Sequence, residues 1–174
     1  ARSLARAPKL LLLDEPLGAL DKKLREETQF ELMDIQEKTG TTFVIVTHDQ
    51  EEAMTVASRI AVMDEGRVIQ VATPSNIYEA PNSVYVADFI GDVNIIEGAA
   101  KRAGDGYDIT WAEGVAPLHT RKEEGELIAI PDGGKAYLAI RPEKVAIHTE
   151  KPQGMTNAVQ GRIIDVAYLG NLST

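Results

Sequence analysis

Two short runs of apolar residues stand out in the first half of the chain. Leu10 to Leu13 is four consecutive leucines, and Thr42 to Thr47 is apolar and rich in β-branched residues. Neither run alternates between apolar and polar positions, which is the pattern of a strand buried on both faces of a parallel sheet. The two runs therefore predict two buried strands in an α/β region.

A long helix is predicted between these strands. Asp21 is a favourable N-cap residue, the helix runs from about Lys22 to Lys38, and Gly40 closes it. Four residues at helical spacing form its inner face, and four charged residues are expected to face solvent. The inner residues are Leu24, Thr28, Leu32 and Ile35, and the solvent-facing residues are Lys22, Arg25, Glu26 and Glu37.

Shorter elements complete the first 92 residues. Residues 1–7 resemble the last turns of a helix, which Pro8 ends. Asp49 and Glu52 have capping-box spacing for a helix that continues to about Ser58. A hairpin and two helices follow. The hairpin is Ile60–Met63 and Val68–Val71 around Asp64-Glu65-Gly66; the helices begin after the N-caps Thr73 and Ser83 and end at Pro81 and Gly91.

The pattern changes at Asp92. Short alternating stretches separated by Gly- and Pro-containing turns are typical of a small all-β barrel or sandwich. The stretches are Ile95–Ala99, Tyr107–Trp111, Leu127–Ile130, Ala136–Ile140, Val145–Ile147 and Gly161–Val166. The sequence predicts two domains, residues 1–92 and 93–174, and we expect both ends of the sequence to fall inside elements, because neither carries a boundary signal.

Charge and composition exclude several function classes. The chain of 174 residues has a net charge of −9. Residues 1–92 carry 9 basic and 16 acidic side chains, or −7, whereas residues 93–174 carry 9 and 11, or −2. This acidity argues against a nucleic-acid-binding surface. No cysteine is present, which excludes disulfide and thiolate chemistry, and no apolar run approaches the roughly 20 residues of a membrane span.

Three polar residues lie where the two predicted strands end. Asp14 and Glu15 come after the run Leu10 to Leu13, and His48 comes after the run Thr42 to Thr47. Ligands bind beyond the carboxyl ends of strands in open α/β sheets, and paired acids at such a rim suit phosphoryl transfer with hydrated Mg²⁺. The alternative interpretation is a polar turn and a structural histidine. Because His48 lacks metal-ligand spacing, we reject a zinc site.

These motifs resemble those of ABC-transporter ATPase subunits. Leu10 to Glu15 is similar to a Walker B strand with its catalytic glutamate, Gly18 to Asp21 to the D-loop, and Thr47-His48-Asp49 to the switch histidine motif. Residues 93–174 resemble a C-terminally truncated OB-like TOBE extension, with Arg141-Pro142-Glu143 and Tyr168-Leu169-Gly170 as its marks. The resemblance is to the maltose/polyamine importer type and, within it, to putrescine- and spermidine-type subunits.

The resemblance implies a fold, a site and partners. The fold is an α/β P-loop NTPase part followed by a small all-β OB-like domain, and the cofactors are ATP and Mg²⁺. Asp14 would hold Mg²⁺ through water, Glu15 would orient and deprotonate the attacking water, and His48 would contact the γ-phosphate. Asp21 would reach the nucleotide site of the other subunit in a homodimer, besides capping its helix. The implied partners are transmembrane permease subunits and, indirectly, a periplasmic solute-binding protein, at the cytoplasmic face of a bacterial inner membrane.

The sequence also departs from this family pattern. It contains no Gly-x-x-x-x-Gly-Lys-Ser/Thr P-loop, no Q-loop and no Leu-Ser-Gly-Gly-Gln signature. In the family the P-loop strand lies between the strand that ends at His48 and the strand at Ile60–Met63, so its absence leaves two strand edges unpaired. We therefore expect this part of the chain to rearrange, to exchange elements with another copy or to be only partly ordered. We predict that this polypeptide alone does not hydrolyse ATP.

Three other function classes stand beside the ATPase. A β-rich regulatory or dimerisation module that binds a small ligand without catalysis remains an alternative. A chromosome-maintenance ATPase would require long heptad coiled coils or a basic surface, and neither is present. Single-strand binding by the OB-like part would require a basic groove with stacking aromatic residues, for which Trp111 and a few tyrosines in an acidic chain are poor material.

Overall fold

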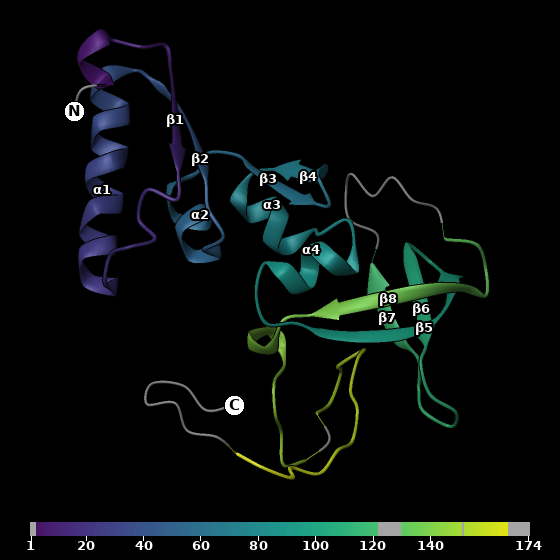
Figure 1. Ribbon diagram of the computed structural model, residues 1–174. Helices are drawn as coiled ribbons and strands as arrows, with labels where there is room; N and C mark the ends of the chain where they lie inside the picture. Colours follow the sequence, from purple (N-terminus) through teal and green to yellow (C-terminus); the bar gives the residue numbers. More distant parts are fainter. Residues whose placement is uncertain (1–2, 122–129, 151, 167–174) are drawn as a thin grey trace. The chain divides into compact units, whose positions relative to one another are not determined.

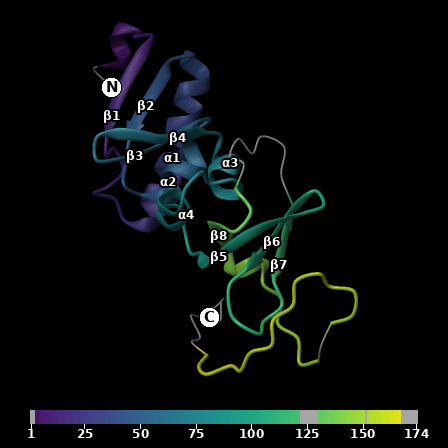
Figure 2. The ribbon, with the colours of Figure 1, turned by 90° about the vertical axis from the view of Figure 1, so that its right-hand side faces the viewer.

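The structure is a computed structural model, which describes residues 3–121, 130–150 and 152–166 (Figure 1). The chain divides into two compact units, Ala1–Asp92 and Val93–Thr174. Among the described residues, four α-helices lie in the first unit and a four-stranded sheet lies in the second. Figure 2 shows the same elements from the side. None of the helices in the described ranges has the length and apolar character needed to cross a bilayer.

The first unit begins with two parallel strands joined by a long helix. Strand β1 is Leu10–Asp14, helix α1 is Lys22–Thr39 and strand β2 is Thr42–Val46. The register pairs Leu10 with Thr42 and Asp14 with Val46, so both strands end at the same edge. The two strands and their parallel arrangement confirm the prediction from the apolar runs.

The prediction that these strands are buried on both faces is wrong. Burial alternates along both strands, and Leu12 and Val46 are 70% and 58% exposed. Every second residue of both strands is exposed, so within the described residues one face of this two-stranded sheet has no covering layer. An uninterrupted apolar run indicates which faces a strand could bury, and the layers packed on those faces decide how much is buried.

The ends of helix α1 follow the predicted signals. The Asp21 carboxylate accepts a hydrogen bond from the Leu24 N–H at 3.0 Å, and Gly40 closes the helix in the left-handed conformation with φ 61°. Arg25, however, was expected to face solvent and instead pairs with Asp49. The residues before Pro8 form a short 3-10 helix, Leu4–Arg6, instead of the end of an α-helix.

The rest of the first unit surrounds a small apolar core. Helix α2 is Gln50–Val56, strands β3 (Ile60–Asp64) and β4 (Arg67–Ala72) form a hairpin, and α3 (Pro74–Glu79) and α4 (Val84–Phe89) follow, with Thr73 and Ser83 as N-caps. These elements confirm the predicted hairpin and caps. The core residues are Ile60, Val62, Ile77, Val86 and Ile90. Strands β2 and β3 belong to separate sheets.

The second unit is built on one antiparallel sheet. Its strands are β5 (Asn94–Ala103), β6 (Gly106–Thr110), β7 (Leu118–Arg121) and β8 (Gly134–Ile140), in the order β7-β6-β5-β8. A short 3-10 helix, Pro142–Lys144, follows β8. The buried core residues of this sheet are Ala100, Tyr107, Ile109 and Ala136. Three of the predicted alternating stretches therefore form strands.

The other predicted strands of this unit have different outcomes. Val145–Ile147 and Gly161–Val166 are not strands, and their Ile147 and Ile164 side chains are 80% and 87% exposed. Alternation identifies a possible strand face, but a strand also requires a neighbour for its backbone hydrogen bonds. The prediction at Leu127–Ile130 lies outside the described residues except for Ile130, and β7 was not predicted. The described residues form an open sheet and not a closed barrel.

Candidate functional site

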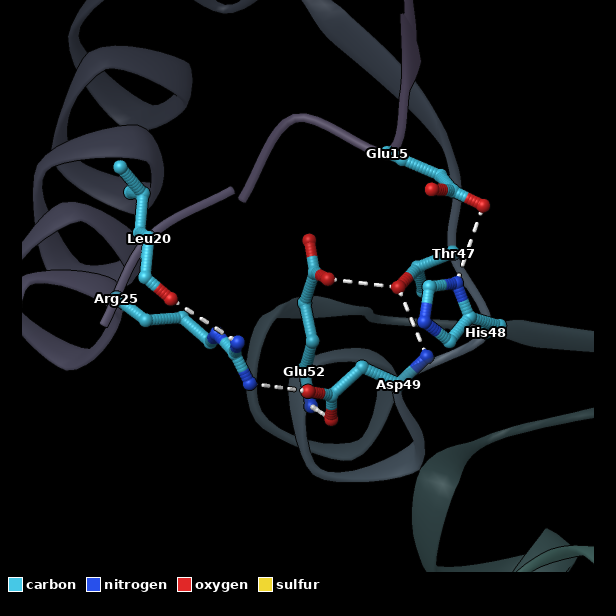
Figure 3. Close-up of polar contacts among 7 residues, drawn as sticks. All are labelled: Glu15, Leu20, Arg25, Thr47, His48, Asp49 and Glu52. Carbon is cyan, nitrogen blue, oxygen red and sulfur yellow. Dashed lines mark hydrogen bonds and ion pairs between the residues drawn. The ribbon is translucent and has the colours of Figure 1, made fainter. Parts of the chain in front are cut away.

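The ends of β1 and β2 bring two sequence-predicted residues together (Figure 3). Glu15 follows the last residue of β1, and its N–H donates to the Val46 carbonyl at 2.8 Å. His48 lies two residues after the end of β2. The parallel register places both residues at the carboxyl edge of the sheet, which is where α/β sheets bind ligands.

The backbone of Glu15 adopts an unusual conformation. Its φ is 43°, in the left-handed region that residues with a Cβ occupy at a cost. This conformation lets the chain turn away from β1 immediately after the bond to Val46, and it leaves the carboxylate 55% exposed at the rim. Strained backbone of this kind gathers at functional positions, so it is an independent indication of a site.

The Glu15 and His48 side chains are in direct contact. Glu15 Oε1 and His48 Nδ1 lie 3.0 Å apart, and the His48 side chain is 75% exposed. An ionised carboxylate can only accept a hydrogen bond, so Nδ1 is the donor and Nε2 remains available on the other side of the ring. The pair can therefore present a proton acceptor and a second imidazole nitrogen to a ligand at this rim.

A buried polar network supports the backbone around His48. The Thr47 hydroxyl accepts a hydrogen bond from the Asp49 N–H at 3.0 Å and donates to Glu52 Oε2 at 2.7 Å. Asp49 in turn caps α2 by accepting from the Glu52 N–H at 3.0 Å. Only 2% of Glu52 is exposed. The predicted capping box is thus relayed, because the Glu52 carboxylate reaches the Asp49 N–H through the Thr47 hydroxyl.

Helix α1 contributes a cation to the same network. Arg25 Nη1 lies 2.6 Å from Asp49 Oδ2, and Arg25 Nη2 donates to the Leu20 carbonyl at 3.1 Å. The Arg25 and Asp49 side chains are 30% and 25% exposed. Helical spacing alone placed Arg25 among solvent-facing charges, because spacing carries no information on a partner in another helix. Asp49, the acidic N-cap residue of α2, was the one signal in the sequence that could have identified the ion pair with Arg25.

The other two predicted site residues do not join this cluster. Asp14 is exposed at the end of β1, and within the described part of the chain its carboxylate makes no hydrogen bond. The Asp21 carboxylate caps α1. Among the described residues, no group of three or more His, Cys, Asp or Glu side chains is arranged to hold a metal ion. Mg²⁺ keeps several of its waters and is usually bound through one or two carboxylates instead of a closed protein cage. A single free carboxylate such as that of Asp14 suits this kind of binding.

Comparison with known proteins gives relatives for both parts of the chain. The family model for the TOBE domain matches residues 138–174. Across 174 residues, 99% of the chain, it is 49% identical to the putrescine transport ATP-binding protein PotG of Escherichia coli. It is also 44% identical to the spermidine/putrescine import ATP-binding protein PotA of Trichodesmium erythraeum and 46% identical to that of Rubrobacter xylanophilus, with 98% of the chain covered in each case.

The chain spans less than half the length of these relatives. It covers 45% of the Escherichia coli and Trichodesmium erythraeum proteins and 44% of the Rubrobacter xylanophilus protein. The match extends across both units, so the resemblance inferred from the motifs at Asp14, Glu15 and His48 applies to the whole sequence.

Proposed function

We propose that this chain forms part of the ATP-hydrolysing subunit of an ABC importer. The proposal rests on its similarity, along its whole length, to ATP-binding proteins of polyamine import. Unit Ala1–Asp92 is the proposed part of the P-loop ATPase domain, and unit Val93–Thr174 is the proposed OB-like TOBE extension. The observation that carries this proposal is the 3.0 Å contact between Glu15 and His48 at the carboxyl ends of parallel strands.

The geometry supports a separate task for each site residue. Glu15 accepts the proton of the attacking water, and a positioned base contributes about 10²- to 10⁴-fold to the rate. His48 would hold the Glu15 carboxylate through Nδ1, which leaves Nε2 to contact the γ-phosphate. Asp14 would hold Mg²⁺ through water, and bound Mg²⁺ neutralises charge that develops on the transferred phosphoryl group. Asp21 caps α1, and it would also reach the nucleotide site of the other subunit in a homodimer.

The same relationship supports the proposed cargo and partners. Relatives are named for putrescine and spermidine, so we assign a polyamine such as putrescine as the solute. The subunit works as a homodimer on transmembrane permease subunits at the cytoplasmic face of the membrane, and a periplasmic binding protein delivers the solute. The 174-residue chain alone is proposed to be inactive, because its sequence contains no P-loop to grip the phosphates.

The proposal is tested with the intact subunit, of the length of its relatives, assembled with its permease in vesicles. Putrescine together with its binding protein should stimulate ATP turnover at least fivefold, and His48→Ala should lower the stimulated turnover to a small residual rate. An exposed pair on α1, Lys38 and Asp34, provides the control: Lys38→Ala should leave turnover within twofold, since exposed ion pairs contribute little. Turnover that His48→Ala leaves unchanged, or that responds equally to maltose and putrescine, would contradict the proposal.

A further inference from the structure

The side chain of His48 is held by little besides Glu15, whereas its backbone is held from both sides. Its ring is 75% exposed, and its hydrogen bond within the described residues is the one to Glu15. The Thr47 hydroxyl accepts from the Asp49 N–H at 3.0 Å and so closes a short ring around the His48 backbone. A hydrogen-bonded ring that a side chain closes in this way fixes the conformation of a turn, where the backbone has no helix or sheet hydrogen bonds.

Glu52 supports the hydrogen-bonded ring around the His48 backbone by accepting a hydrogen bond from the Thr47 hydroxyl. Its Oε2 accepts from the Thr47 hydroxyl at 2.7 Å, and with 2% exposure it has no water with which to exchange that bond. Glu52 Oε1 is buried and has no hydrogen-bond partner among the described residues. Burying a carboxylate with one oxygen unsatisfied costs stability. The cost is understandable if the carboxylate serves the Thr47 hydroxyl.

Asp49 closes the network on the far side of His48. Its Oδ1 accepts from the Glu52 N–H at 3.0 Å, and its Oδ2 pairs with Arg25 at 2.6 Å. The residues on either side of His48 are therefore fixed by α2 and, through Arg25, by α1. Rotation about the side-chain bonds of His48 is the main freedom that this arrangement leaves to the imidazole.

We propose that Thr47 and Glu52 are positioning residues that act through His48: their hydrogen bond sets the His48 backbone so that the ring meets the Glu15 carboxylate. The inference rests on the proposed function, because it concerns the rate of the same hydrolysis step. Neither residue touches the reacting atoms. Loss of their bond should leave ATP binding intact and lower kcat, because a misplaced group slows the chemical step more than it weakens binding.

The test is a double-mutant cycle in the intact subunit. Thr47→Val removes the hydroxyl and keeps the side-chain volume, and we expect kcat to fall about tenfold at a KM within twofold of the wild-type value. In a His48→Ala background the same change should lower the residual rate by less than twofold, since residues that act as one unit are not additive. Thr47→Ser should restore kcat to within threefold of wild type.

Glu52 supplies a second arm if Thr47→Val fails to fold. Glu52→Gln retains an oxygen that can accept from Thr47 and should keep kcat within threefold, whereas Glu52→Ala should lower it about tenfold. Val86 lies on α4 in the buried core of the first unit. Val86→Ala is therefore the matched control for lost stability and should leave kcat within twofold. An equal effect of Thr47→Val with and without His48 would overturn the inference alone. Unchanged turnover in Glu15→Gln and His48→Ala would overturn the proposed function itself.

Discussion

Glu15 has an exposed carboxylate and a left-handed backbone conformation. Both properties arise because Glu15 directly follows the last residue of β1. The N–H of Glu15 is bound to Val46, so the chain turns with φ at 43° before it reaches Pro16. Left-handed backbone costs about 1–3 kcal/mol at a residue with a Cβ. A glycine would avoid this cost but would lack the carboxylate that contacts His48.

The strain at Glu15 can be measured by comparing two substitutions that both remove the carboxylate. In the 174-residue chain, Glu15→Gly should have a free energy of unfolding about 1 kcal/mol higher than that of Glu15→Ala, because only glycine adopts this φ without cost. Urea unfolding followed by far-UV circular dichroism measures the difference, since all four described α-helices lie in the first unit. Equal stability of the two variants would show that the turn is not left-handed in solution.

The sequence identified Glu15 and His48 because their position is a consequence of strand order. Glu15 directly follows β1 and His48 directly follows the run Thr42 to Thr47, and two parallel strands end at one edge. Thr47, Glu52 and Arg25 could not be found in the same way. Their roles depend on distances between α1, α2 and the end of β2, which local spacing does not encode.

At the scale of elements, caps were more predictable than strand partners. Asp21, Asp49, Thr73 and Ser83 each accept the helix N–H that their residue type predicts. A cap is a contact within three residues, so sequence determines it locally. Strands β1 and β2 were found but their exposed face was not, and residues 145–147 and 161–166 alternate without a strand partner, because pairing depends on distant parts of the chain.

The β5–β6 contact of the second unit provides a prediction at this scale. A Cβ on Gly98 would lie 2.7 Å from Ile109 Cγ2 and 2.7 Å from the Thr110 carbonyl oxygen. Gly98→Ala should therefore lower the free energy of unfolding of this unit by about 1–3 kcal/mol, the usual cost of overpacking. Fluorescence of Trp111, the only tryptophan in the sequence, follows this unit during urea unfolding.

Gly161 supplies the control for that substitution. A Cβ added to Gly161 would meet no described atom within 4 Å, and the Gly161 backbone is not left-handed. Gly161→Ala should therefore leave the midpoint of the same fluorescence transition unchanged. A Gly98→Ala variant as stable as Gly161→Ala would contradict the close approach of β5 to β6.

At the scale of the whole chain, the two units differ in charge and architecture. The change of sequence pattern at Asp92 coincides with the division of the structure, and most of the negative charge lies in the first unit. Strands β2 and β3 stay in separate two-stranded sheets, and β1 and β2 expose apolar residues such as Leu12 and Val46. We propose that these edges and faces are completed in the intact subunit, which is also where the site at Glu15 would act.

The most direct test of this account is ATP turnover by the intact subunit with and without the Glu15 carboxylate. Glu15→Gln should bind ATP within threefold of the wild-type affinity and hydrolyse it at least 10²-fold more slowly, because the amide cannot accept the proton of the attacking water. The 174-residue chain, assayed in parallel, should show no turnover above background. Hydrolysis at the wild-type rate by Glu15→Gln would contradict the central claim.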